Sequence, residues 1–362
     1  MDISTPRRTA RALSARRTAA RLITASCLAL AALCTSLTPA HAVTIDWVTV
    51  GDAGNSADDT GYGAVAESYR IGKYEVTIGQ YTAFLNAAAK SDPYSLYNTN
   101  MATNLNSAGI SRAGSSGAYT YSVIGPSGVT PAGASSPGNR PMAFVRWFDA
   151  ARFANWMHNG QGSGSTETGA YTLAGATSGT APARNPGAQF YIPTEDQWYK
   201  AAYYKGGGTN AGYWDYATQS DSAPGNTIGS GANQANYYVA NWAVTQSSSY
   251  SDSQNYLTDV GAFTGSPSAY GTFDQSGNVW ELNDLTGAAG SSRGYRGGDW
   301  NSNSELSLSS SWRETGAPTI AGSGLGFRLA SPVAVPEPST WAMGLAGIAC
   351  AGWGTYRRRK RA

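Results

Sequence analysis

Three carboxylates lie close together in GTFDQSGNVWELND, the stretch from residue 271 to residue 284. Asp274, Glu281 and Asp284 could form an acid/base site, a metal site or the polar rim of a turn. Two acids about 5 to 10 Å apart can hydrolyse glycosides, whereas oxygen ligands around a glycine-containing turn suit Ca²⁺. The residue types present in the rest of the chain help to decide between these possibilities, because each chemistry needs further ligands or catalytic side chains.

Soft metal ligands and nucleophiles are scarce. All three cysteines lie in the apolar stretches near the two ends of the chain, so residues 43–335 contain none. The only histidine in that range is His158. A disulfide, a cysteine nucleophile, a thiolate metal site and a multi-histidine metal site within one chain are therefore excluded from residues 43–335.

Two other motifs are interpreted as structural. The GSSRG stretch around Ser292 matches the G-x-S-x-G pattern of serine hydrolases, but no apolar strand precedes it and no helix follows. His158 ends a helical pattern, where a cation is favoured by the helix dipole. We expect no catalytic role for either residue.

The charge is unevenly distributed along the chain. Of 25 basic and 23 acidic residues, six basic residues lie within 1–42 and five within 336–362, with one acid in each segment. Residues 43–335 thus keep 14 basic and 21 acidic side chains, a net charge of about −7. Without a basic stripe to neutralise phosphates, we expect no nucleic-acid partner.

Residues 1–42 have the features of a secretory signal peptide. An arginine-rich start leads into an apolar run, and the run ends in the small-x-small pattern Ala40-His41-Ala42. We expect cleavage after Ala42. A retained membrane anchor is the alternative, which the shortness of the apolar run disfavours.

Residues 332–362 form a second targeting segment. Pro336, Glu337 and Pro338 precede an apolar stretch and a terminal basic cluster. This order resembles the PEP-CTERM sorting signal of Gram-negative bacteria. The resemblance implies an exosortase-type peptidase as partner, transient insertion of the tail in the membrane as a transmembrane helix, and release to the cell surface or an exopolysaccharide matrix. A plain tail anchor is the alternative.

Three short helices are expected between the two targeting segments. Thr77 and Thr194 each have a glutamine three residues later, and these capping boxes predict helix starts. The pattern RWFDAARFANWMHNG predicts a helix that ends at Asn159-Gly160. Long stretches rich in Gly, Ser and Thr separate these helices without marking a boundary, so residues 43–331 are predicted to form one domain.

Six motifs occur in a fixed order between residues 69 and 330: RIGKYEVTIGQYTAFLN, PMAFVRWFDAARFANWM, YIPTEDQWYKAAYY, GTFDQSGNVWEL, YRGGDWN and GLGFRLA. Together they resemble the formylglycine-generating enzyme family, also called the sulfatase-modifying factor domain. The resemblance implies an α+β fold related to C-type lectins, loop-rich, with a few short helices and short strands.

The oxidase members of that family bind copper through two cysteines. The matching positions here are Ser302 and Ser307. A serine hydroxyl is hard and protonated, unlike the soft thiolate that copper(I) prefers. The histidine cluster and added helical domain of the sulfoxide-synthase relatives are also missing. We expect no copper and no catalytic residues.

The resemblance also implies calcium at two sites. The first would use the carboxylates of Asp274 and Glu281 with the carbonyls of Gly277 and Val279, which would leave neither acid free for proton transfer. The ligands of the second are the side chains of Asn236 and Asp252 and the carbonyls of Tyr237 and Gln254. The alternative at the first site is that both acids cap local turns.

The sequence therefore predicts an exported, non-catalytic binding module with a glycan or protein ligand. One alternative is an oxidoreductase of the same family with a metal site that needs no cysteine. Another is a purely structural matrix component.

Overall fold

A computed structural model describes residues 42–131 and 134–333. The chain divides into two compact units, Met1–Val43 and Thr44–Ala362, and the second is described here by itself. The signal segment up to residue 41 and the sorting motif at Pro336, Glu337 and Pro338 lie outside the described residues.

The three expected helices form where the capping signals place them. In α2 (Ile78–Ala88) and α5 (Glu195–Tyr203), the threonine at the N-cap accepts from the backbone of the third helical residue, and the glutamine there returns the bond. The α4 helix (Trp147–His158) ends at Asn159, and Gly160 follows with φ +83°. A fourth helix, α3 (Asn100–Thr103), is a single turn.

The strands are short and form four small sheets. A three-stranded sheet has the order β1-β2-β11, a four-stranded sheet has the order β10-β7-β8-β9, and β3-β4 and β5-β6 are hairpins. All pairs are antiparallel except β10 with β7. The strand bounds are β1 Trp47–Val50, β2 Tyr69–Gly72, β3 Ile110–Ala113, β4 Thr120–Val123, β5 Tyr238–Val239, β6 Asn241–Trp242, β7 Trp280–Asn283, β8 Arg293–Arg296, β9 Glu314–Gly316, β10 Leu325–Gly326 and β11 Ala330–Pro332.

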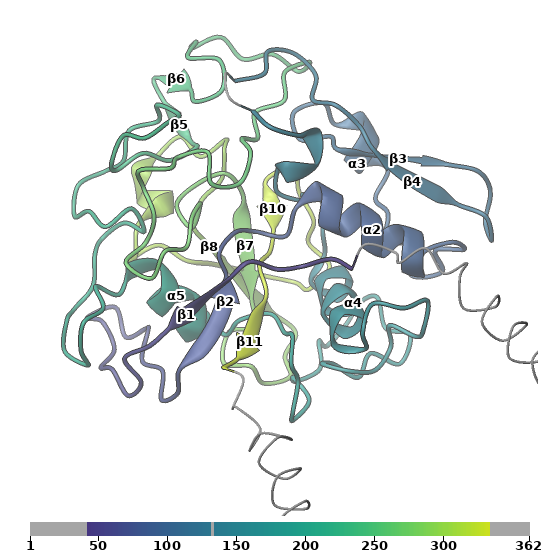
Figure 1. Cartoon of the computed structure of the whole chain (residues 1–362), viewed down its shortest axis with the longest axis horizontal. Coiled ribbons are helices and arrows are strands. Elements are labelled where there is room, and N and C mark those ends of the chain that lie inside the picture. Colours follow the sequence, from purple (N-terminus) through teal and green to yellow (C-terminus); the bar gives the residue numbers. More distant parts are fainter. Residues whose placement is uncertain (1–41, 132–133, 334–362) are drawn as a thin grey trace, which may run out of the picture. The chain divides into compact units, whose positions relative to one another are not determined.

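The β7 strand lies between α4 and α5 in the view of Figure 1. Both helices reach it with a tryptophan: Trp147 of α4 donates to Asp284 at the end of β7, and Trp198 of α5 donates to Glu281 within it. The sequence from Asp274 to Asp284 is therefore held from two sides. Two 3-10 turns, η1 (Pro137–Asn139) and η2 (Glu305–Leu308), lie in the loops.

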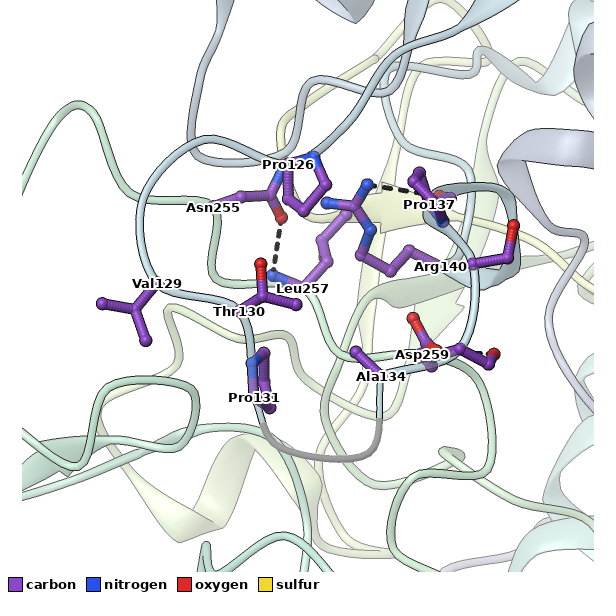
Figure 2. A pocket seen from close by; sticks show the side chains of 12 residues that line it. Pro126, Val129, Thr130, Pro131, Ala134, Pro137, Arg140, Asn255, Leu257 and Asp259 are labelled. Carbon is purple, nitrogen blue, oxygen red and sulfur yellow. Dashed lines mark hydrogen bonds between the residues drawn. The ribbon is translucent and has the colours of Figure 1, made fainter.

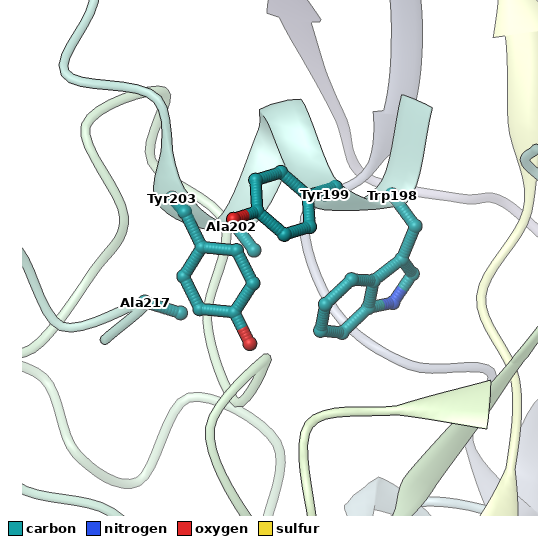
Figure 3. Close-up of a cluster of buried hydrophobic side chains, with 5 residues drawn as sticks. All are labelled: Trp198, Tyr199, Ala202, Tyr203 and Ala217. Atoms are coloured by element: carbon teal, nitrogen blue, oxygen red, sulfur yellow. The ribbon is translucent and has the colours of Figure 1, made fainter. Parts of the chain in front are cut away.

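Aromatic side chains make up much of the core. Figure 3 shows one cluster, in which Trp198, Tyr199 and Tyr203 of α5 surround Ala202 and Ala217. The rings of Tyr199 and Tyr203 meet edge to face with centroids 4.9 Å apart, a favourable geometry for aromatic pairs. The many Tyr and Trp residues thus bury enough surface to hold the long loops in place.

The α+β, loop-rich character expected from the sequence is confirmed. Among the described residues, no helix combines the length and the apolar composition that a membrane crossing requires. The apolar stretch of the tail lies outside those residues.

Candidate functional site

The turn that begins at Asp274 has a strained backbone that positions its side chains. Asp274, Gly277 and Asn278 all have positive φ, of 63°, 88° and 63°. A Cβ on Gly277 would lie 2.3 Å from the carbonyl oxygen of Asn236, so only glycine allows that close approach. The turn is thereby fixed against the loop that carries Asn236.

Glu281 is fully buried and paired with an arginine. Its two carboxylate oxygens accept from Nε and Nη2 of Arg328, each at 2.5 Å, and Oε2 also accepts from Trp198 Nε1 at 2.8 Å. Such bidentate pairs are strong and geometrically specific. Glu281 therefore has a cationic partner from the chain itself, and this differs from the predicted role of Glu281 as a calcium ligand.

Glu75 is a second buried acid in this region, and it lacks such a partner. It is 2 % exposed; Oε1 accepts weakly from Asn278 Nδ2 at 3.3 Å, and Oε2 has no hydrogen-bond partner among the described residues. Burial raises the pKa of Glu75 well above its usual range, and the charges of Asp274 and Glu281 raise it further. Glu75 and Asp274 therefore form one electrostatic cluster.

Asp274 has a single strong hydrogen bond. Its Oδ2 accepts from the backbone N–H of Gly261 at 2.6 Å. Burial raises the pKa of Asp274 to about 6, although the Gly261 bond and the charge of Arg328 oppose the shift. A hard cation beside Glu75 Oε2 and Asp274 would satisfy both groups, since Ca²⁺ prefers carboxylate and carbonyl oxygens. At the first predicted site, Asp274 and Glu75 would be the side chains able to hold such an ion, because Glu281 is already paired with Arg328.

The ligands predicted for the second calcium site are differently placed. Asn236, Tyr237 and Gln254 are buried, whereas Asp252 lies in an exposed stretch. The Tyr237 carbonyl accepts from Asn226 Nδ2 at 3.1 Å, and the Gln254 carbonyl accepts from Asn106 Nδ2 at 2.8 Å. Amide side chains already satisfy these two carbonyls, so this geometry offers a cation less than the first cluster does.

Ser302 and Ser307, the positions predicted to match the copper cysteines, lie after the Gly297-Gly298 turn. Ser302 Oγ donates to Asp299 Oδ1 at 2.9 Å and accepts from the Asp299 backbone N–H at 3.0 Å. Ser307 lies in η2. Burial raises the pKa of Asp299 to about 6, and its bonds from Ser302 and Asn301 limit the rise. Ser302 is therefore held within a local turn.

Asp284, left unassigned by the sequence, is a buried structural hub. Its carboxylate accepts from Trp147 Nε1 and from the Tyr171 hydroxyl, each at 2.6 Å, and lies 3.0 Å from Arg293 Nε. Three segments far apart in the chain meet on this one side chain. Asp284 thus binds the fold together and is not available as an acid or base.

Side chains that commonly bind metals do not gather in groups of three in the described ranges. Across residues 42–131 and 134–333, no group of three or more His, Cys, Asp or Glu side chains is arranged to hold a metal ion. Asp274 and Glu75 are two such carboxylates and do not reach that number by themselves.

Comparisons with known proteins agree with the motif order. The family model for the sulfatase-modifying factor enzyme 1-like domain matches residues 48–333, and the model for the PEP-CTERM protein-sorting motif matches residues 334–360. No curated protein matches the chain in sequence.

Solved structures resemble this chain distantly. CarF is 21 % identical over 80 % of this chain and 99 % of its own, with a TM-score of 0.42. The Treponema denticola variable protein 1 is 19 % identical over 81 % and 97 %, with a TM-score of 0.42. PvdO from Pseudomonas aeruginosa is 18 % identical over 80 % and 93 %, with a TM-score of 0.39.

Proposed function

Since the chain belongs to the sulfatase-modifying factor enzyme 1-like domain family and carries a PEP-CTERM sorting motif, we propose that it is a non-catalytic binding module of the cell surface or extracellular matrix. The sorting motif indicates export to the envelope of a Gram-negative bacterium and an exosortase-type peptidase as the processing partner. After export, the protein would act at the cell surface or in the matrix, and its role there would be to bind a ligand.

The observation that carries the proposal is the chemistry at the two positions where oxidase relatives have copper cysteines. Ser302 Oγ is bonded to Asp299 and Ser307 lies in a 3-10 turn. Hydroxyls stay protonated at neutral pH and are poor ligands for copper(I), so the oxygen-activating chemistry has no ligands here. A family scaffold without these ligands is best suited to binding.

A stack of aromatic rings near these serines supports a binding role. Tyr250 stacks on Tyr256 with centroids 5.8 Å apart, and Tyr256 stacks on Trp300 at 5.1 Å. Tyr250 at the outer end is 51 % exposed. An exposed, pre-ordered ring presents an apolar face and a hydroxyl to a glycan or protein ligand at low entropic cost.

We also propose calcium as a structural ion held by Asp274 and Glu75. Glu75 Oε2 is buried without a partner, which a bound cation would correct. The ion would link the connection between β2 and α2, which carries Glu75, to the turn at Asp274.

Two measurements on the purified protein test the binding proposal. The protein is sedimented with extracellular polysaccharide from the producing cells, and its copper content is measured after copper loading. We expect saturable retention and no bound copper. The Ser302→Cys/Ser307→Cys double variant is the matched control, expected to gain copper binding. Absence of retention on every matrix fraction, or copper bound in stoichiometric amount by the unaltered protein, would overturn the proposal.

A further inference from the structure

Five arginines are buried in the described part of the chain, and one of them differs from the rest. Four contact a carboxylate at 3.0 Å or less: Arg152 with Glu167, Arg293 with Asp284, Arg296 with Glu195 and Arg328 with Glu281. Arg140 is 3 % exposed and has no ion pair among the described residues. Its Nη2 donates to the Pro137 carbonyl at 3.2 Å, and its Nη1 has no hydrogen-bond partner within residues 42–131 and 134–333.

The side chain of Arg140 lines a cavity of about 240 Å³. Figure 2 shows its guanidinium among Pro126, Leu257 and Pro137. Six of the twelve lining residues are apolar: Pro126, Val129, Pro131, Ala134, Pro137 and Leu257. Small-ligand sites combine apolar lining residues with a few polar groups that fix the ligand's orientation, and this cavity has both.

A buried arginine does not lose its charge as readily as a buried acid does. A buried acid can become neutral by taking up a proton, whereas burial lowers the pKa of Arg140 only to about 10, with the charge of Asp259 opposing the shift. Arg140 therefore remains charged at neutral pH. A buried charge without a counter-ion is costly, and the other four arginines show the usual remedy.

Asp259 lines the same cavity but does not supply that counter-ion. Its Oδ2 accepts from the Ser135 backbone N–H at 2.6 Å and from the Ser135 hydroxyl at 2.9 Å. Its Oδ1 accepts no hydrogen bond from the described residues. The cavity thus offers a buried cation without a carboxylate among the described residues and, separately, one oxygen of a half-buried carboxylate that can accept from a ligand.

We propose that this cavity binds a sugar acid, with the carboxylate on Arg140 and a ring hydroxyl donating to Asp259. The inference rests on the proposed binding function and names its ligand class. A hydroxylated carboxylate meets both demands at once, and the apolar C–H faces of a sugar ring suit the proline-rich wall. A neutral sugar would leave Arg140 without a carboxylate, and a simple fatty acid would offer no donor to Asp259 Oδ1.

The volume of the cavity indicates that it binds one monosaccharide unit at a time. Typical small-molecule sites measure about 300 to 1,000 Å³, so about 240 Å³ holds a single ring. A second cavity of about 350 Å³ adjoins the first and shares Pro131, Ala134, Ser135 and Asp259 with it. The adjoining space can take the next unit, so the acid could be free or part of an acidic polysaccharide.

Titration calorimetry on the full-length protein tests the inference. The probes are galacturonate, tetragalacturonate and the neutral sugar galactose. We expect galacturonate to bind at least about tenfold more tightly than galactose. A further gain for the tetramer would assign the polymer as the source, and equal affinity per site would assign the free acid. Equal binding of galactose and galacturonate, or no binding of either acid, would overturn the inference.

Two variants test whether Arg140 itself binds the acid. Arg140→Met should weaken galacturonate binding at least about tenfold while the protein stays folded, because no carboxylate loses its partner. Arg184→Met is the matched control: Arg184 lines a different cavity, so galacturonate binding should not change. If the acid bound Arg140→Met as tightly as the unaltered protein, the pocket assignment would be wrong.

The two proposals can fail separately. If the protein and Arg140→Met are both retained on native matrix polysaccharide while neither binds galacturonate, the module binds elsewhere and only the pocket assignment fails. If nothing is retained and galacturonate still binds, the pocket stands and the matrix role fails.

Discussion

Arg293, Arg296 and Arg328, on or near the central four-stranded sheet, each contact a buried carboxylate, whereas Arg140 in the loop region faces a cavity without one. All four guanidiniums are buried, so burial alone does not distinguish them. The partners of Arg296 and Arg328 come from segments far away in the chain, so these two pairs tie distant segments together. Arg140, in contrast, is paired with no carboxylate of the described residues.

This difference indicates that the sheet arginines stabilise the fold, whereas Arg140 binds a ligand. A paired arginine is satisfied in the folded state, so its removal strands a carboxylate. An arginine beside a cavity has its charge and donor available for an outside group. The following predictions test whether the two regions really differ in this way.

The largest effect is expected at the central pair. Arg328→Met leaves the Glu281 carboxylate buried without its cation and should lower the free energy of unfolding by about 3 to 5 kcal/mol, as seen in urea denaturation. Arg313→Met is the control, because Arg313 is about one-third exposed and its partner Glu195 keeps Arg296. A loss at Arg328 no larger than at Arg313 would contradict the structural role of the pair.

A pH-dependent effect is expected at Asp299, a buried acid without a cation. Its pKa in the folded state is about 6, above the value of about 3.9 in the unfolded chain. The folded state binds the proton more tightly, so this stabilisation is complete below about pH 3.9 and is lost as the pH rises through about 6. Its full size is about 3 kcal/mol at most.

Asp299→Asn removes this titration while keeping an acceptor for Ser302. The free energy of unfolding, measured by denaturation from about pH 4 to about pH 8, should fall less with rising pH in the variant than in the unaltered protein. Identical slopes for the two proteins would show that Asp299 does not carry the effect.

Calcium removal should have a smaller and concentration-dependent effect. An ion that binds only the folded state adds about 2.7 kcal/mol at a hundredfold excess over its Kd, so chelation should lower the melting temperature. Glu75→Gln and Asp274→Asn should each abolish the response. A response that survives both substitutions would move the ion away from this cluster.

The smallest effect is expected at Arg140. Arg140→Met removes an unpaired buried charge, so the free energy of unfolding should change by less than about 1 kcal/mol or increase. The measurement is thermal unfolding without ligand. A loss of several kcal/mol would mean that Arg140 has a structural partner after all, and the contrast with Arg328 would disappear.

The sequence predicted what local chemistry determines. Thr77 and Thr194 cap helices because their hydroxyls and the glutamines three residues later satisfy the first backbone N–H groups, which is a local arrangement. The ordered motifs gave the family and the tail gave the sorting signal. Asn159-Gly160 ended its helix as expected.

What the sequence did not predict depends on contacts between distant segments. Glu281 and Arg328 are 47 residues apart, and no spacing rule pairs them. Arg140 and Asp259 meet at one cavity only because the loops that carry them pack together. The KYEV and GLGFRLA motifs contained Glu75 and Arg328, yet they gave no sign of which acid would have a cation and which would not.

Retention on matrix polysaccharide before and after reduction of its carboxylates tests the central claim most directly. The same polymer, with its uronic acids reduced to neutral sugars, differs only in the group that Arg140 is proposed to bind. We predict saturable retention of the protein on the native polymer and its loss on the reduced one. Equal retention on the two polymers would contradict recognition of a carboxylate, and absence of retention on both would contradict the binding role itself.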